Sequence, residues 1–169
     1  MAVLLAVDLG VKTGLALYGQ DGRLLWYRSQ NFGTAERLRR GVRGVLDTLP
    51  HLAWLVLEGG GPLAAMWWRE AARRQVPVRQ ISAESWRRQF LYAREQRNSA
   101  QAKDSATDLA RRVIIWSGAR RPTSLRDDAA EAILIGLWGA LEIGWLEHLP
   151  AAVRRQVLVD QTQRKSCRF

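Results

Sequence analysis

The chain alternates between short apolar runs and longer segments in which apolar residues recur every three or four positions. Residues 3–9 are apolar except for Asp8, and residues 53–57 form a second apolar run that ends at Glu58. Short continuous apolar runs are typical of strands that are buried on both faces of a sheet. We therefore predict two inner strands, each with a carboxylate at or near its carboxyl end.

Turn residues and helical periodicity predict the other elements. Residues 15–18 and 24–29 should form strands joined by a turn at residues 20–22, followed later by a short strand over residues 78–81. Helices are expected over residues 34–49, 63–74, 84–90 and 103–116, with a polar loop over 94–101. A last long helix should run to about Leu146. These elements predict an α/β fold with a central mixed sheet of about five strands flanked by helices.

Candidate caps mark the starts of three predicted helices. Thr34 and Ser82 have side chains that can accept a hydrogen bond from the first helical turn. The segment Ser124–Asp127 has the form of a capping box and should open the last helix.

The length and composition are typical of one globular domain. A chain of 169 residues with 47% hydrophobic and 25% charged residues can bury its own core. We assign residues 1–150 to this domain and residues 151–169 to a basic, loosely attached tail. The single cysteine, Cys167, favours a reducing compartment. We expect neither a signal peptide nor a membrane span, and hence a cytoplasmic, nucleoid-associated protein.

The charge of the chain favours a polyanionic partner. The formal net charge is +10, and all but three of the 26 basic residues are arginines, the exceptions being Lys12, Lys103 and Lys165. The planar guanidinium group suits phosphate, so we interpret the charge as favouring nucleic acid. An arginine-rich but merely solvated surface is the alternative, and charge does not identify the kind of nucleic acid.

Four carboxylates occupy positions where an acid is costly. Asp8 and Glu58 end buried strands, whereas Asp128 and Glu131 lie one helical turn apart among small and apolar residues. A buried carboxylate requires a cation or a hydrogen-bond donor to offset its desolvation. Carboxylate oxygens suit Mg²⁺ or Mn²⁺, and two such ions about 3.5–4 Å apart can promote phosphodiester cleavage.

Each of these acids also has an ordinary structural interpretation. Asp8 could cap a strand end, and Glu58 could pair with an arginine. Asp127 and Asp128 could simply stabilise the positive end of a helix. Their order and placement together favour a metal site, in which Asp127 is the reserve candidate because it lies four residues before Glu131.

Five ordered segments resemble the motifs of RuvC-type Holliday junction resolvases, within the RNase H-like superfamily. The segments are Asp8–Ala16, Leu55–Glu58, Ile81–Arg87, Ala102–Ala106 and Asp128–Ala132. The tryptophan-containing segment and the Lys-Asp-x-Ser stretch are most similar to plastid and phage members of the family. The resemblance covers roughly residues 3–145 and implies an RNase H-like fold.

The resemblance also implies an activity. The expected enzyme is a homodimeric endonuclease that resolves four-way DNA junctions by paired nicks. Asp8, Glu58, Asp128 and Glu131 would bind two Mg²⁺ or Mn²⁺ ions per active site. Apart from the metal ligands, Lys103 could be catalytic by steadying the charge of the scissile phosphate, or it could be a solvated lysine at a helix start. Branched DNA is the expected partner, with recombination proteins as further candidates.

The sequence departs from the family at three positions. Many members have a histidine before the last motif, and segment 124–127 contains none; the fourth acid is Glu131, as in some relatives, rather than aspartate. Bacterial members have an aromatic residue three positions after the second-strand glutamate, where this chain has Gly61. Met66, Trp67 or Trp68 could replace that aromatic residue.

The helix over residues 63–74 is predicted to form the dimer interface. It has more apolar surface than an exposed helix needs, from Leu63, Met66, Trp67 and Trp68.

Several polar residues are predicted to contact nucleic acid. They are Lys12, Thr13, Arg69, Arg73, Arg87, Arg88, Arg94, Arg97, Lys103 and Ser105.

Three rival functions remain open from the sequence. The nearest is a YqgF-type nuclease of the same fold that acts on ribosomal RNA precursors, although Lys103–Ser105 and the position of Glu58 argue against it. An actin-like or sugar-kinase ATP-binding fold would need a second domain, and the spacing of a P-loop is absent. A non-catalytic module that binds branched DNA is the third, against which the intact acids argue.

Overall fold

A mixed five-stranded sheet lies at the centre of the computed structural model, which describes residues 1–92 and 98–154. The strands are β1 (Val3–Asp8), β2 (Lys12–Gly19), β3 (Leu24–Asn31), β4 (Leu52–Glu58) and β5 (Val78–Ile81). Their spatial order is β3-β2-β1-β4-β5. The first three strands are antiparallel, whereas β4 and β5 run parallel to β1. The two predicted inner strands are therefore neighbours, and both end at the same edge of the sheet.

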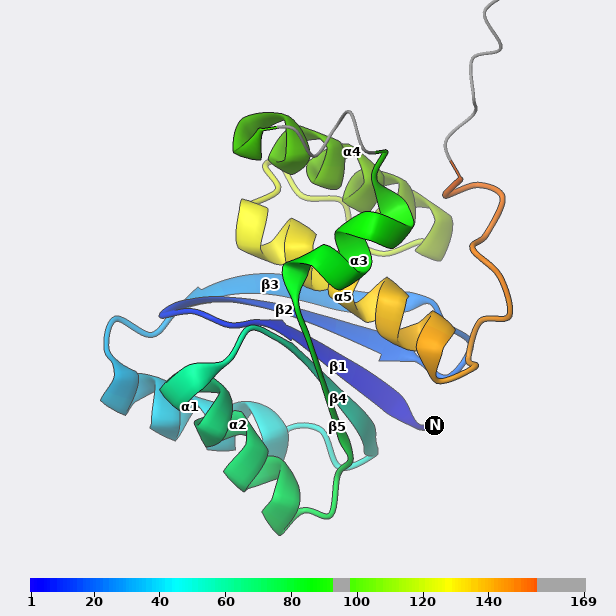
Figure 1. Cartoon of the computed structure of the whole chain (residues 1–169). Helices are drawn as coiled ribbons and strands as arrows, with labels where there is room; N and C mark the ends of the chain where they lie inside the picture. The colour runs from blue at the N-terminus through cyan, green and yellow to red at the C-terminus, as the bar shows by residue number, and fades with distance from the viewer. Residues whose placement is uncertain (93–97, 155–169) are drawn as a thin grey trace, which may run out of the picture.

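Helices cover both faces of this sheet (Figure 1). They are α1 (Ala35–Asp47), α2 (Gly61–Arg73), α3 (Ala83–Phe90), α4 (Ser99–Ser117) and α5 (Asp127–Glu142). The helices α1 and α2 lie on one face, and α3, α4 and α5 lie on the other, with α5 directly against the sheet. The predicted α/β fold with flanking helices is confirmed.

Side-chain alternation along the strands divides the core into two layers. On β1, Leu4 and Ala6 belong to the cluster under α5, whereas Leu5 and Val7 belong to the cluster under α1 and α2. On β4 the same alternation sends Val56 toward α5. This parity also decides on which face the acids at the strand ends lie.

The helix α5 lies unusually close to the sheet because small residues line its contact surface. A Cβ atom on Gly136 would lie only 2.3 Å from the Tyr18 ring. The Tyr18 hydroxyl donates a 2.6 Å hydrogen bond to the Ile133 carbonyl oxygen, which fixes the helix along β2. The first turn of α5 is thereby held over the ends of β1 and β4.

The first residues of the helices confirm one predicted cap and contradict two others. Thr34 does cap α1, since its side chain accepts a hydrogen bond from the Arg37 amide. The predicted capping box is wrong, because α5 begins at Asp127 with Arg126 as N-cap and has no side-chain cap bond. Ser82 is the N-cap of α3, but it makes no side-chain cap bond and contacts the Ser85 hydroxyl instead.

Two predicted boundaries also move. The helix α4 begins at Ser99, inside the predicted loop, because the Asn98 side chain accepts a hydrogen bond from the Gln101 amide. The last helix ends at Glu142 rather than near Leu146. Val153, at the start of the predicted tail, is buried in the core under α5, and residues 155–169 lie outside the described residues.

The part of the chain that the structure describes contains no helix that is both long and apolar enough to cross a bilayer.

Candidate metal centre

Asp8 and Glu58 are brought together by the pairing of two parallel strands. They are register partners at the carboxyl ends of β1 and β4. Each lies two residues after a side chain that packs under α5, Ala6 and Val56 respectively. Since alternate residues of a strand face the same side, both carboxylates face α5, with their backbones about 4.8 Å apart.

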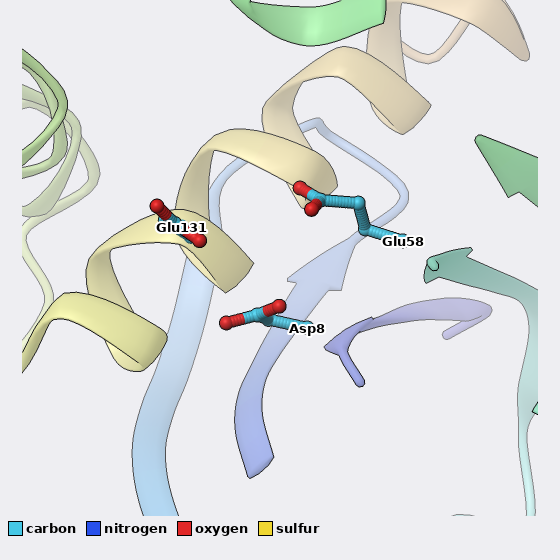
Figure 2. Close-up of side chains that lie close together, drawn as sticks. All are labelled: Asp8, Glu58 and Glu131. Atoms are coloured by element: carbon cyan, nitrogen blue, oxygen red, sulfur yellow. The ribbon is translucent and has the colours of Figure 1, made fainter. Parts of the chain in front are cut away.

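The third acid of the cluster comes from α5. A carboxylate oxygen of Glu131 lies within 4.8 Å of one from Asp8 and one from Glu58 (Figure 2). This approach depends on Gly14, the register partner of Asp8 on β2. A Cβ atom on Gly14 would lie 1.9 Å from the Asp128 carbonyl oxygen, so only glycine lets the first turn of α5 reach this position.

The clustered negative charge shifts the protonation of the acids. Burial raises the pKa of Asp8 from 3.8 to about 8, with further increases from the charges of Glu131, Glu58 and Asp128 and an opposing decrease from Arg87. Burial also raises the pKa of Glu58, against a decrease from its hydrogen bond to Trp86. Without a cation, the cluster therefore favours the protonated form of Asp8, as expected for carboxylates that repel one another.

Adjacent residues of α3 hold two of the three acids. The indole N–H of Trp86 donates a 2.5 Å hydrogen bond to Glu58, and the Arg87 guanidinium lies 3.2 Å from Glu131. Trp86 is fully buried, and the Arg87 guanidinium carbon lies 5.1 Å from the centre of its ring. Donors of this kind fix the orientation of carboxylates that bind a metal. The sequence singled out this segment by resemblance but did not identify these contacts.

Asp128 lies beside the cluster but is turned toward other partners. One of its carboxylate oxygens accepts a 2.5 Å hydrogen bond from the Ser29 hydroxyl, and the other accepts one from the Ala129 amide. Its charge still acts on Asp8. Among the described residues, the carboxylates with oxygens within 4.8 Å of one another are those of Asp8, Glu58 and Glu131, without Asp128. Ser29 on β3 is a partner that no sequence motif indicated.

Asp127, the reserve candidate, faces a different neighbour. Its carboxylate lies 3.4 Å from the Lys103 ammonium of α4, and both side chains are more than half exposed. The ion pair places Lys103 one helical turn of α5 away from Glu131, so the predicted catalytic lysine lies near the acids without contacting them.

The donor set fits a hard divalent cation. Three partly buried carboxylates offer oxygen ligands within 4.8 Å of one another, and their mutual repulsion would be relieved by a dication. Mg²⁺ and Mn²⁺ prefer such ligands over the nitrogen and sulfur ligands that suit zinc. The cluster can therefore bind a divalent cation at the edge of the sheet.

The predicted DNA contacts are distributed over several surfaces. Lys12, Arg69, Arg73, Arg88 and Lys103 are exposed, whereas Arg87 and Ser105 are half-buried. The prediction for the Thr13 side chain is wrong, because Thr13 is fully buried and its hydroxyl donates to the Gly10 carbonyl oxygen. Arg94 and Arg97 lie outside the described residues.

The adjacent tryptophans of α2 have different environments. Trp67 is fully buried in the core under α1 and α2, so its predicted place in the dimer interface is wrong. Trp68 is 42% exposed, and its indole N–H donates a 3.0 Å hydrogen bond to the Gln80 side chain of β5.

Comparison with known proteins supports the fold through structure rather than sequence. No protein-family model matches the chain, and no curated protein sequence matches it. Among solved structures, RuvC from T. thermophilus, in complex with Holliday junction substrate, is similar with a TM-score of 0.60 and 17% identity. The alignment covers 85% of this chain and 96% of that chain. The chain thus has the RNase H-like fold.

Proposed function

We propose that this protein is a divalent-metal-dependent endonuclease that resolves four-way DNA junctions. The observation that carries the proposal is the cluster of Asp8, Glu58 and Glu131 at one edge of the RNase H-like sheet. The structurally similar T. thermophilus RuvC is bound to a Holliday junction, and the net charge of +10 suits a DNA substrate. Charge, fold and acid cluster thus point to the same class of reaction.

Each acid has a defined part in this proposal. Asp8, Glu58 and Glu131 would hold Mg²⁺ or Mn²⁺, two ions per active site. Asp128 would be the fourth ligand after its carboxylate turns away from the Ser29 hydroxyl. When bound, the ions supply Lewis-acid stabilisation of the phosphate and an activated water. Trp86 and Arg87 orient Glu58 and Glu131. Lys103 would approach the scissile phosphate from α4.

A homodimer would match the two-fold symmetry of a four-way junction, since two identical sites can cut symmetry-related strands. The helix α2 offers a surface for it. Its inward face is Ala64, Trp67 and Ala71, whereas Ala65, Trp68 and Ala72 form an exposed stripe on the side toward β5. This apolar stripe is the proposed dimer surface, with Trp68 at its centre.

The test is cleavage of a labelled four-way junction by the full chain with Mg²⁺ or Mn²⁺, beside linear duplex DNA and ribosomal RNA precursors. Paired, symmetric nicks in the junction are expected. Cleavage confined to the RNA would identify a YqgF-type nuclease instead. Junction binding without cleavage under any metal condition would identify a non-catalytic module.

Asp8→Asn gives the decisive variant. Loss of one ligand charge should lower cleavage by orders of magnitude while junction binding is kept. Asp108→Asn removes one charge from an exposed position on α4 and is the matched control. Near-normal cleavage by Asp8→Asn would show that Asp8 is not a ligand.

A further inference from the structure

A basic groove lies on the face of the sheet opposite the metal centre. It runs between α1 and α2, has a volume of about 260 Å³, and is lined by five arginines together with Met66 and Glu70. The arginines are Arg39, Arg40, Arg43, Arg69 and Arg73. The two helices lie on the side of the sheet away from α5 (Figure 1), so the groove is separate from the acid cluster.

Acidic residues offset only part of this charge. The Glu70 carboxylate accepts hydrogen bonds from Arg73 at 2.8 Å and from Arg74 at 2.7 Å. Arg40 and Arg43 have exposed acids of their own helix at 3.9 and 3.8 Å, distances at which a surface ion pair contributes little. Within the described part of the chain, Arg39 and Arg69 make no hydrogen bond or ion pair.

The arginines of the groove form two rows, one along each helix. Arg39 and Arg43 lie one turn apart on α1, as do Arg69 and Arg73 on α2. The helices run parallel, since α1 joins β3 to β4, α2 joins β4 to β5, and all three strands point the same way. Two rows of guanidinium groups therefore face a common groove. Like charges held together on rigid helices repel, and a bound polyanion would relieve that repulsion.

We propose that this α1–α2 groove binds the sugar-phosphate backbone of duplex DNA, as a second contact with the substrate outside the metal centre. The identity of the polyanion rests on the proposed function. Guanidinium groups bind phosphate oxygens through paired donors, so two rows of them suit a repeating phosphate chain. The contact would position the duplex without reading its sequence.

The location of the groove is compatible with one continuous duplex. Both helices start at the edge of the sheet where Asp8 and Glu58 lie, and the four arginines of the two rows come four to twelve residues later. At 1.5 Å per helical residue they lie about 6–18 Å along the helix axes from that edge. Because the groove also lies on the opposite face of the sheet from the acids, the duplex would have to pass around this edge, and its contact with the arginines would lie several base pairs from the cut.

The groove is also distinct from the proposed dimer surface. Consecutive helical residues differ by about 100° around the axis, so Arg69 and Trp68 point to different sides of α2. Arg69 lines the groove shared with α1, whereas Trp68 contacts Gln80 of β5. DNA could therefore occupy the groove while α2 also forms the dimer.

The test compares two double variants of the full chain, Arg39→Gln with Arg69→Gln in the groove and Arg111→Gln with Arg112→Gln on α4. Both remove two positive charges, and all four arginines are exposed. Binding of a four-way junction and of linear duplex is measured in EDTA over a range of salt concentrations. The groove variant should bind both DNAs about ten-fold more weakly, with a salt dependence reduced by about two counterions.

The outcomes separate the proposal from its rivals. Equal losses in both double variants would show that only net charge matters and would overturn the groove site. Wild-type affinity in the groove variant would also overturn it. Binding is also measured with competitors: inorganic phosphate, a mononucleotide or a short unlabelled duplex. If the short duplex competes best, the groove binds a phosphate backbone as proposed. If the groove instead binds the small anions selectively, the proposal is contradicted.

Two further readouts keep this test independent of the metal centre. The groove variant should melt at or slightly above the wild-type temperature, because it loses repulsion and no ion pair; a large decrease would indicate a structural role instead. If the chain proves not to cut DNA, the comparison of the two double variants still tests whether the groove binds DNA. If it cuts, the groove variant should require more junction for half-maximal rate, with kcat little changed.

Discussion

Trp86 and Arg87 stand next to each other on α3, yet they orient acids on two different elements. Trp86 donates to Glu58 on β4, and Arg87 contacts Glu131 on α5. Because the Trp86 ring is buried and supports the Arg87 guanidinium, a change in one is expected to affect the other. A single turn of helix thus sets the position of two of the three clustered carboxylates.

Trp86→Phe tests this positioning role. Phenylalanine fills much of the same space but lacks the N–H donor, so Glu58 loses its oriented partner. We expect the apparent affinity for Mn²⁺ or Mg²⁺ to fall by about 10–100-fold, with much of the cleavage rate recovered at saturating metal. Metal titration without DNA, followed by calorimetry, gives a readout that is independent of activity.

Trp138→Phe is the control for this substitution. It removes an indole packed against the same core on α5, and that indole is not hydrogen-bonded to any of the acids. A similar loss of metal affinity in both variants would attribute the effect of Trp86→Phe to core packing.

Asp8 predicts a pH dependence of stability for the metal-free protein. Its pKa is about 8 when folded and near 3.8 when unfolded, so folding takes up a proton between these values. Stability therefore falls as pH rises through this window, and below it the group has no effect. Asp8→Asn should raise the melting temperature above that of the wild type in EDTA, most at pH 8.5 or higher and hardly at pH 4.

Divalent cations should reverse this trend in the wild type, because they favour the ionised carboxylates. Melting curves with and without Mg²⁺ check this, with Asp108→Asn as the reference for removing one charge. A stability difference that is the same at every pH would contradict a raised pKa at Asp8.

The helices and strands differ in how well their positions could be predicted from the sequence. The convergence of Asp8 and Glu58 could be predicted, since apolar runs mark buried strands and parallel neighbours end at one edge. The start of α5 could not, because Arg126 is held extended and no side chain caps the helix. The contact of Trp86 with Glu58, 28 residues away, depends on how α3 packs, which no local pattern encodes. For the same reason Ser29 was not predicted as a partner of Asp128.

Gly14 determines how close α5 comes to the sheet. An added Cβ would overlap the Asp128 carbonyl group at 1.9 and 2.4 Å, and backbone cannot move as a side chain can. Gly14→Ala should displace the first turn of α5, destabilise the fold by about 1–3 kcal/mol, and separate Glu131 from Asp8. Thermal melting and metal titration measure the two effects.

Gly44→Ala provides a control on α1, where an added Cβ meets nothing within 4 Å. There alanine should be neutral or stabilise by up to about 1 kcal/mol, because it lowers the entropy of the unfolded chain. If Gly14→Ala behaved like Gly44→Ala and bound metal normally, the close approach of α5 would not be needed for the site.

At the scale of the whole molecule, α2 contributes side chains to three different surfaces. Its inward face packs under the sheet, one flank carries the arginines of the α1–α2 groove, and the other carries the exposed Trp68 stripe. The acid cluster lies beyond its first residue, on the opposite face of the sheet. A dimer formed through the Trp68 stripe would therefore leave the arginines of the α1–α2 groove outside the interface.

Trp68→Glu tests that assembly. A charge at the centre of the apolar stripe cannot be desolvated against its symmetry mate, so the dimer should dissociate, with an increase in Kd of about 100-fold or more. Light scattering over a concentration series measures the change. Ile115→Glu, at an apolar position on α4 that is 57% exposed, is the control and should leave the mass unchanged. Metal binding should survive in the monomer, because all three clustered acids come from one chain. Paired nicking should give way to single nicks, and a wild-type protein that stays monomeric with junction DNA bound would rule the dimer out.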